Sequence, residues 1–211
     1  MASAPSLKAV LLGSGLVALA VTASFLHEER PAAEKRPQPL EAPPGWELAG
    51  HHIEGYEVSF DEKGGRRGGQ ALRIASVLPE PPGFAGVARQ VDPGPYRGRR
   101  LALLADARAD AVGGWAGLWM RIDTPEQRSW ALDNMQERPL RGTLDWQPYR
   151  VVLDVPGHAS QIYYGALLYG AGTVWLEGFE LSEANPDEPS TEPAASQLRR
   201  RGLDFEEGSR R

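Results

Sequence analysis

The sequence predicts an all-β domain, an antiparallel β-sandwich or jelly roll, preceded by one hydrophobic helix. Between residues 46 and 181, short apolar or alternating runs are separated by turn-forming clusters of Gly and Pro. No part of this region shows the 3.6-residue apolar repeat that predicts an amphipathic helix. About eight short strands in ~135 residues are typical of two packed antiparallel sheets.

Residues 1–26 are predicted to be a membrane anchor or a signal peptide. The run 9–26 carries no charge and follows Lys8. As a helix it would span about 27 Å, close to the ~30 Å hydrocarbon core of a bilayer. A signal peptide would be cleaved near the small residues 18–20 or 21–23 and give a secreted or periplasmic protein. We expect the uncleaved, single-pass anchor, which leaves the rest of the chain outside the cytoplasmic membrane.

The remaining chain divides into a linker, one domain and a tail. Residues 27–45 contain five prolines among charged residues and no aromatic residue before Trp46, which predicts a disordered spacer. Residues 46–181 hold all six tryptophans and all six tyrosines and are the predicted β-sandwich. Residues 182–211 are predicted to be a disordered, charged tail. The alternative for residues 203–205 of that tail is docking on a sheet edge.

Eight strands are expected in the domain, with one long connection at 124–144 that interrupts their rhythm. Loops of that length without regular structure are often functional. The expected strands cover residues 57–60, 71–77, 86–91, 99–108, 114–123, 147–155, 161–169 and 172–181.

Composition excludes several classes of function. The absence of cysteine excludes disulfides, thiol catalysis and Cys-ligated zinc. An exported protein without disulfides is ordinary in bacteria, whereas small animal secreted domains usually carry them, so we expect a bacterial protein. The formal net charge of -5 and the shortness of the basic clusters argue against a nucleic-acid partner.

The segment 115–123 is the strongest candidate for a binding face. In a strand, side chains alternate between the two faces. One face then carries Ala116, Leu118, Met120 and Ile122, which suits a core. The opposite face carries aromatic and charged residues that could stack on a sugar ring and bond its hydroxyls: Trp115, Trp119, Arg121 and Asp123.

Four further residues are candidates for ligand contact. Gln90 lies in a short apolar strand and can both donate and accept hydrogen bonds. Asp133 and Asn134 lie in the long connection, and Arg138 is held extended by the proline that follows it. Every candidate has a structural alternative. The tryptophans could pack under the connection, Arg121 and Asp123 could form an ion pair, and Asp133 and Asn134 could brace the loop.

Catalysis has little support, so we expect a protein that is not an enzyme. None of the four histidines, at positions 27, 51, 52 and 158, is placed for a Ser–His–Asp arrangement. The spacing of Asp123 and Asp133 does not favour a glycosidase carboxylate pair over solvated charges. We expect no cofactor, although a structural calcium ion stays open as an alternative.

Several short motifs in a fixed order carry a resemblance to a known family. They are Tyr56, Gly69-Gln-Ala-Leu, Phe84, Gln90, Tyr96-Arg-Gly-Arg, Ala116-Gly-Leu-Trp-Met-Arg-Ile-Asp, Leu132-Asp-Asn-Met, Arg138-Pro, Gly142-Thr, Asp145-Trp, residues 151–156, Gly165 and Val174-Trp. Residues 46–181 thereby resemble the accessory β-sandwich domain found C-terminal in many bacterial AraC-type regulators. The resemblance implies a galactose-binding-like jelly roll that holds a small ligand. This sequence shows no helix-turn-helix segment beside it.

Two functions follow from these observations. The first is a non-catalytic module that binds a small molecule or saccharide, displayed outside a bacterial membrane. The alternative is a structural or protein-interaction domain of the cell envelope, or a sensory domain related to those of transcriptional regulators. A solvent-filled groove lined by Trp119, Arg121 and Asn134 would favour the first, and a flat apolar patch would favour a protein partner.

Overall fold

The computed structural model describes residues 41–200. The predicted anchor or signal peptide, most of the proline-rich linker and the segment 203–205 lie outside the described residues. The strands are β1 (Glu47–His51), β2 (Tyr56–Asp61), β3 (Ala71–Ser76), β4 (Phe84–Val91), β5 (Arg100–Asp123), β6 (Ala131–Asp133), β7 (Leu140–Asp154), β8 (Gln161–Tyr169) and β9 (Thr173–Glu183). The helices are one α-helix, α1 (Ala194–Arg200), and two 3₁₀ turns, η1 (Ile53–Gly55) and η2 (Gly94–Tyr96). No helix within residues 41–200 is long and apolar enough to cross a membrane.

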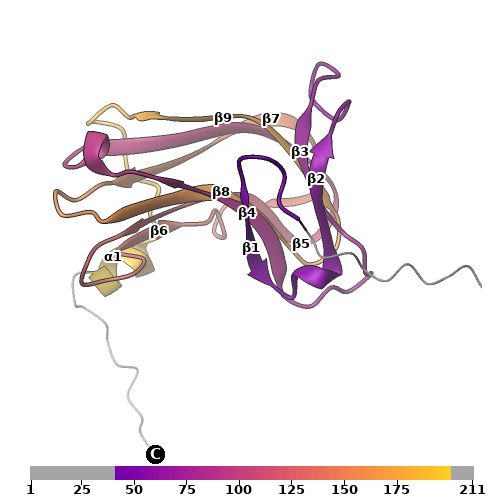
Figure 1. The fold of residues 1–211 in the computed structure, drawn as a ribbon, viewed down its shortest axis with the longest axis horizontal. Helices are drawn as coiled ribbons and strands as arrows, with labels where there is room; N and C mark the ends of the chain where they lie inside the picture. Colours follow the sequence, from indigo (N-terminus) through magenta and orange to yellow (C-terminus); the bar gives the residue numbers. More distant parts are fainter. Residues whose placement is uncertain (1–40, 201–211) are drawn as a thin grey trace, which may run out of the picture. The chain divides into compact units, whose positions relative to one another are not determined.

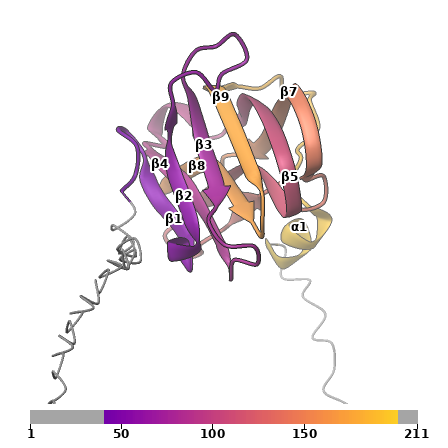
Figure 2. The same cartoon turned by 90° about the vertical axis from the view of Figure 1, so that its right-hand side faces the viewer.

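The prediction of an all-β antiparallel domain is confirmed. Every strand pairing among the described residues is antiparallel. The strands form one sheet that curls over itself into two layers (Figure 1). We call β2, β3, β9, β7 and the first half of β5 the β9 layer. We call β1, β4, β8, β6 and the second half of β5 the β8 layer. Figure 2 shows β3, β9, β5 and β7 of the β9 layer side by side.

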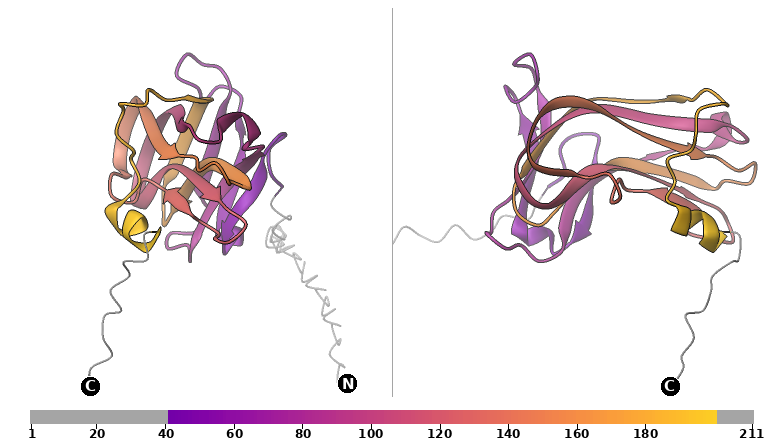
Figure 3. Two further views of the ribbon diagram at one scale, coloured as in Figure 1. Left: turned by 90° about the vertical axis from the view of Figure 1, so that its left-hand side faces the viewer. Right: turned by 180° about the vertical axis from the view of Figure 1, so that it is seen from behind.

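The long strand β5 joins the two layers. The sequence predicted two strands here, at 99–108 and 114–123, whereas the structure contains one strand of 24 residues. Its first half pairs with β9 as far as Asp110, and its second half pairs with β8 from Trp115 onward. Register shifts against β7 fall between Ala107 and Ala116, and Ala111 has a left-handed φ of 49°. Such bulges bend and twist a strand, and Figure 3 shows the strands bending from one layer into the other.

The core lies between the layers, and its β5 residues are those that the alternation predicted. Ala116, Leu118, Met120 and Ile122 are all fully buried. They pack in one cluster with inward-facing residues of the β9 layer such as Leu103. The prediction that this strand has one apolar face toward the core is therefore confirmed.

The ordered domain extends past both of its predicted boundaries. Pro43 is buried, and its carbonyl oxygen accepts the Trp46 N–H at 3.0 Å, so packing begins before residue 46. Strand β9 runs to Glu183, Ala184 is buried, and helix α1 follows. The prediction of a disordered tail from residue 182 is therefore wrong for residues 182–200.

Two arginines of the β-sheet hold this C-terminal segment. Arg100 binds Asp154 at 2.7 and 3.1 Å and also donates to the backbone carbonyls of Pro186 and Glu188. Its hydrogen bonds to Asp154 raise the pKa of Arg100 above its usual value. Arg150 binds the Glu188 carboxylate at 2.5 and 2.8 Å. These charged contacts replace the apolar packing that the tail sequence lacks.

Leu118→Ala should lower the free energy of unfolding by about 2–5 kcal/mol, because it opens a cavity at a fully buried core position. Chemical denaturation of the purified protein measures this. The control is Leu78→Ala, at a side chain that is 45% exposed, for which we expect a loss below about 1 kcal/mol. Similar losses for the two variants would mean that the faces of β5 are assigned the wrong way round.

Candidate functional site

The outer face of the β8 layer contains a groove of about 500 Å³. One side is lined by β1 and the other by residues 128–134, which include β6. The floor comes from β4, β8 and the second half of β5. The lining residues are Glu47, Leu48, Ala49, Gly50, His51, Phe84, Ala88, Trp119, Arg121, Arg128, Ser129, Leu132, Asn134, Tyr163 and Leu167.

The floor is low because small residues occupy its centre. Strand register places Ala88 of β4, Gly165 of β8 and Trp119 of β5 in one row across the layer. A Cβ atom on Gly165 would lie 1.8 Å from the Val87 carbonyl oxygen, so no other residue fits there. A Cβ on Gly86, one row away, would lie 2.3 Å from the Ala166 carbonyl oxygen. These glycines let neighbouring strands and side chains lie close to the floor.

Trp119 lies across this row of small residues. Its indole Nε1 donates a hydrogen bond to the Val87 carbonyl oxygen at 3.2 Å. The same nitrogen is 3.1 Å from where a Gly165 Cβ would be, so the indole passes directly over Gly165. The ring is only half-buried, and it lines the groove. It is therefore a fixed aromatic platform that a ligand can reach.

Arg121 and Asp123 lie beside Trp119 and bind each other. Arg121 donates from Nε and Nη2 to the two Asp123 carboxylate oxygens, at 2.9 and 3.0 Å. The Arg121 guanidinium also stacks on Tyr163, with its central carbon 4.5 Å from the ring centroid. Asp123 is nearly buried and accepts the Ser129 N–H at 2.7 Å. Asp123 therefore positions Arg121. The Arg121 N–H groups that do not bind Asp123 can donate hydrogen bonds to a ligand in the groove.

Two buried carboxylates fix the wall that contains β6. Ser129 and Met135 flank this strand, and each has a left-handed φ, of 54° and 60°. Such angles are unfavourable for residues other than glycine and need support from their surroundings. The Ser129 N–H donates to Asp123, and the Met135 N–H donates to Asp133 at 2.8 Å. The wall is thus held at both of its ends.

Asp133 and Arg138 do not line the groove, which corrects their expected role in ligand contact. Asp133 is fully buried, and Arg138 donates to its two oxygens at 3.1 and 2.6 Å. Thr191 donates to the same carboxylate at 2.5 Å and thereby ties the C-terminal segment to the wall. Since Asp133 faces the interior, Asp123 and Asp133 form no carboxylate pair on the groove.

The structure separates the other predicted residues into two groups. Asn134 lines the groove, and its side-chain oxygen accepts the Gln136 N–H at 3.2 Å. Gln90 and Trp115 belong to the same face of the layer but lie outside the groove lining. Gln90 is exposed, opposite Tyr163, and Trp115 stacks on Tyr169 with ring centroids 6.4 Å apart.

Sequence reasoning missed several lining residues. Arg128 and Tyr163 are examples, together with Glu47, His51 and Phe84 at the β1 side. The alternation of residues 161–169 could have revealed Tyr163, because it places Tyr163, Gly165 and Leu167 on one face. The contribution of β1 had no comparable signal, since its pairing with β4 joins segments far apart in the chain.

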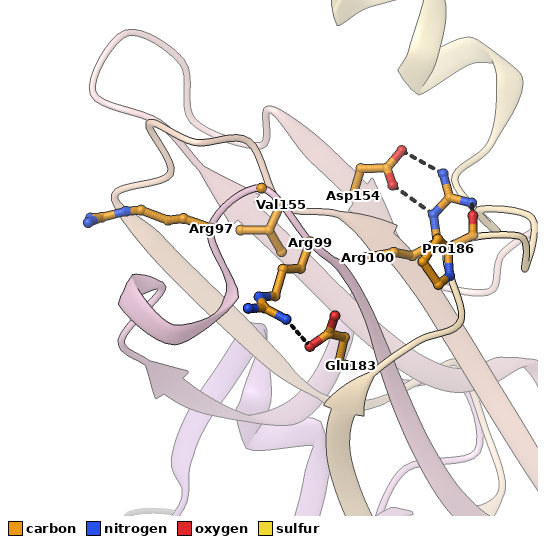
Figure 4. A pocket seen from close by; sticks show the side chains of 8 residues that line it. Arg97, Arg99, Arg100, Asp154, Val155, Glu183 and Pro186 are labelled. Atoms are coloured by element: carbon orange, nitrogen blue, oxygen red, sulfur yellow. Dashed lines mark hydrogen bonds and ion pairs between the residues drawn. The ribbon is translucent and has the colours of Figure 1, made fainter.

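A separate pocket of about 630 Å³ lies away from the groove, beside the turn at residues 97–100 (Figure 4). Its arginines are already engaged. Arg99 pairs with Glu183 at 2.5 Å, Arg100 pairs with Asp154, and Arg97 donates to the Ala159 carbonyl oxygen at 3.0 Å. Figure 4 shows Arg97 extending away from the other two. This pocket offers a ligand little unpaired charge.

Among residues 41–200, no cluster of three or more His, Asp or Glu residues is arranged to hold a metal ion.

Comparison with known proteins identifies the type of fold. No family model matches the chain. The structure of a family 16 carbohydrate-binding module superposes with a TM-score of 0.50 and 18% identity, covering 66% of this chain and 92% of that module. The enzymatically active domain of tailspike protein 4 from bacteriophage CBA120 gives a TM-score of 0.51 and 12% identity, covering 67% of this chain and 20% of that one. The fold of this chain is a β-sandwich similar to that of the family 16 module.

One sequence relative is a bacterial regulator. The chain is 34% identical over 148 residues to the uncharacterized HTH-type transcriptional regulator YbfP of Bacillus subtilis (strain 168). The match covers 70% of this chain and 50% of that protein, so the chain spans about half the length of this relative.

Asp133→Ala should destabilise the domain, because it removes the acceptor for Arg138, Thr191 and the Met135 N–H. Each buried donor left unsatisfied costs about 1–3 kcal/mol, as measured by chemical denaturation. The control, Asp92→Ala, removes an exposed carboxylate that accepts only the Gly94 N–H, and it should cost no more than about 1 kcal/mol. Equal losses for the two variants would show that Asp133 does not fix the wall.

Proposed function

We propose that this chain is a non-catalytic saccharide-binding module and that the groove on the β8 layer is its binding site. The observation that carries the proposal is the half-exposed Trp119 indole, held over Gly165 and bordered by Arg121 and Asn134. Sugar rings present apolar C–H faces that stack on aromatic rings, and their hydroxyl groups need hydrogen-bond partners at the rim. The groove offers an aromatic ring for stacking and polar side chains for hydrogen bonding in one place.

The similarity to a carbohydrate-binding module supports this proposal. The family 16 module is named for carbohydrate binding, and its β-sandwich is similar to that of this chain. The groove also contains the three residues that the sequence analysis required for a ligand site, Trp119, Arg121 and Asn134. A protein-interaction domain would instead need a flat apolar patch. The large apolar side chains that are most exposed among the described residues lie in three places: Val77 and Leu78 directly after β3, Tyr169 at the end of β8, and Leu198 in α1.

We also propose that the domain corresponds to the accessory β-sandwich of AraC-type regulators. The similarity to an HTH-type regulator over 148 residues supports it. In that setting the module would sense a saccharide and report its presence to an attached domain. The ligand-binding chemistry of the groove is the same in either setting.

We also propose that the module lies outside a bacterial cytoplasmic membrane, because the uncharged run 9–26 follows Lys8 and a proline-rich spacer comes after it. Proteolysis of intact spheroplasts tests it, because an external domain is removed while cytoplasmic markers survive. Full protection of the domain until the membrane is lysed would contradict this location.

Trp119→Ala should weaken saccharide binding at least tenfold and leave the fold intact. Aromatic stacking contributes ~0.5–1.5 kcal/mol beyond area burial, and the lost contact area adds to this. A tenfold change corresponds to about 1.4 kcal/mol. The measurement is a screen of a glycan library against the full chain, followed by calorimetric titration of the glycan that binds, with a thermal melt of each variant.

The matched control is Trp146→Ala. Trp146 is also half-buried, but it lies on β7, where its ring centroid is 5.9 Å from the Arg108 guanidinium. Trp146→Ala should bind the same glycan with the affinity of the wild type. Normal binding by Trp119→Ala would reject the groove as the site, and unfolding of that variant would identify Trp119 as a residue needed for the core.

A further inference from the structure

The groove does not end at Arg121. A second hollow of about 560 Å³ adjoins it, formed by residues 123–128 and by Ser160 and Gln161. The two hollows share three lining residues, Arg121, Arg128 and Tyr163. They are therefore adjacent parts of one longer depression on the outer face of the β8 layer.

The length of this depression can be estimated along β8. Gln161 lines the second hollow and Leu167 lines the first, six positions further along the same strand. Six residues of a strand span about 20 Å, at a rise of ~3.3 Å per residue. A single pyranose ring is much shorter than this span, whereas a chain of linked sugars can occupy it.

The two hollows differ in chemistry. The first contains the Trp119 platform and apolar residues such as Leu132 and Leu167. Apart from Pro125, the second is lined by polar side chains, and the ring of Tyr163 is covered by the Arg121 guanidinium. The Tyr163 hydroxyl donates to Gln161 Oε1, which leaves the Gln161 amide nitrogen able to donate to a ligand. This hollow suits hydrogen bonding to hydroxyls instead of stacking.

Arg128 lies at the junction of the hollows. Its side chain is exposed, lines both of them, and has no hydrogen bond or ion pair with other residues in the range 41–200. The next residue is Ser129, whose left-handed backbone is held by Asp123. The Arg128 guanidinium, which has no partner among the described residues, therefore lies on a fixed turn where the two hollows meet.

We infer that the ligand is a linear oligosaccharide, with one sugar stacked on Trp119 and a neighbouring sugar hydrogen-bonded in the second hollow by Gln161 and Arg128. This inference rests on the proposed function. It adds that the site recognises a length of chain and not a single sugar. Affinity should therefore rise with chain length until both hollows are filled.

The test is calorimetric titration of the full chain with gluco-, xylo- and manno-oligosaccharides, β-1,4-linked, from the monosaccharide upward. For a series that binds, we expect the dissociation constant to fall at least tenfold between the shortest ligand that binds and the longest. Gln161→Ala should remove most of this gain and leave the affinity for the shortest ligand unchanged. Trp119→Ala should weaken binding of every length.

Gln70→Ala is the matched control. Gln70 is exposed and makes a single side-chain hydrogen bond, to Glu62 at 2.9 Å, in the connection between β2 and β3. This variant should keep the full length dependence. If binding is independent of chain length, and Gln161→Ala binds all lengths as the wild type does, the inference is wrong while the proposed function stands. If the wild type binds no member of any series, the result counts against the proposed function and the inference together.

Discussion

The absence of a side chain at Gly165 is the constraint on which the candidate site depends. The Val87 carbonyl oxygen occupies the space of a Cβ atom at this position, and the Trp119 indole passes over it to bond that oxygen. A larger residue would push the indole off the floor and separate β4 from β8. The groove is therefore shaped by strand pairing at its centre, and its aromatic platform needs no mobile loop to hold it.

The carboxylates beside the groove have a structural role, which their hydrogen-bond partners show. Asp123 and Asp133 each accept a backbone N–H from a residue with left-handed φ at one end of β6. Each also binds an arginine through both carboxylate oxygens. Removing one partner of such a buried pair leaves an uncompensated charge or donor, which is strongly destabilising. These carboxylates thus position the wall, and the residues that we propose for ligand contact are Trp119, Arg121, Arg128 and Asn134, which line the groove.

Much of this arrangement could be predicted from sequence, because period-two alternation is a local property. It placed Leu118 and Met120 in the core and put Trp119 and Arg121 together on the opposite face. The roles of Asp133 and Arg138 could not be predicted in this way. Both lie in a connection without periodicity, and Thr191, a third member of their network, is 58 positions away from Asp133. The ordered C-terminal segment was missed for the same reason, since Arg100 and Arg150 hold it from distant strands.

Strand β6 shows the same limit at a smaller scale. It has three residues, and its pairing with Met120, Arg121 and Ile122 decides which side of the connection faces the groove. No short-range pattern in the sequence marks so short a strand. Its position is fixed by two carboxylates, Asp133 at its own end and Asp123 at the end of β5, whose contacts form only once the sheet has formed.

The most direct test of the groove as the binding site is a nuclear magnetic resonance titration that follows the indole N–H signals. The chain has six tryptophans and hence six such signals, and Trp119→Phe assigns the one of interest. Addition of a saccharide that binds should shift the Trp119 signal most, because its N–H lies at the floor of the groove. The signals of Trp146 and Trp175, on the β9 layer, should stay in place. A shift confined to these two signals, with that of Trp119 unchanged, would contradict the account.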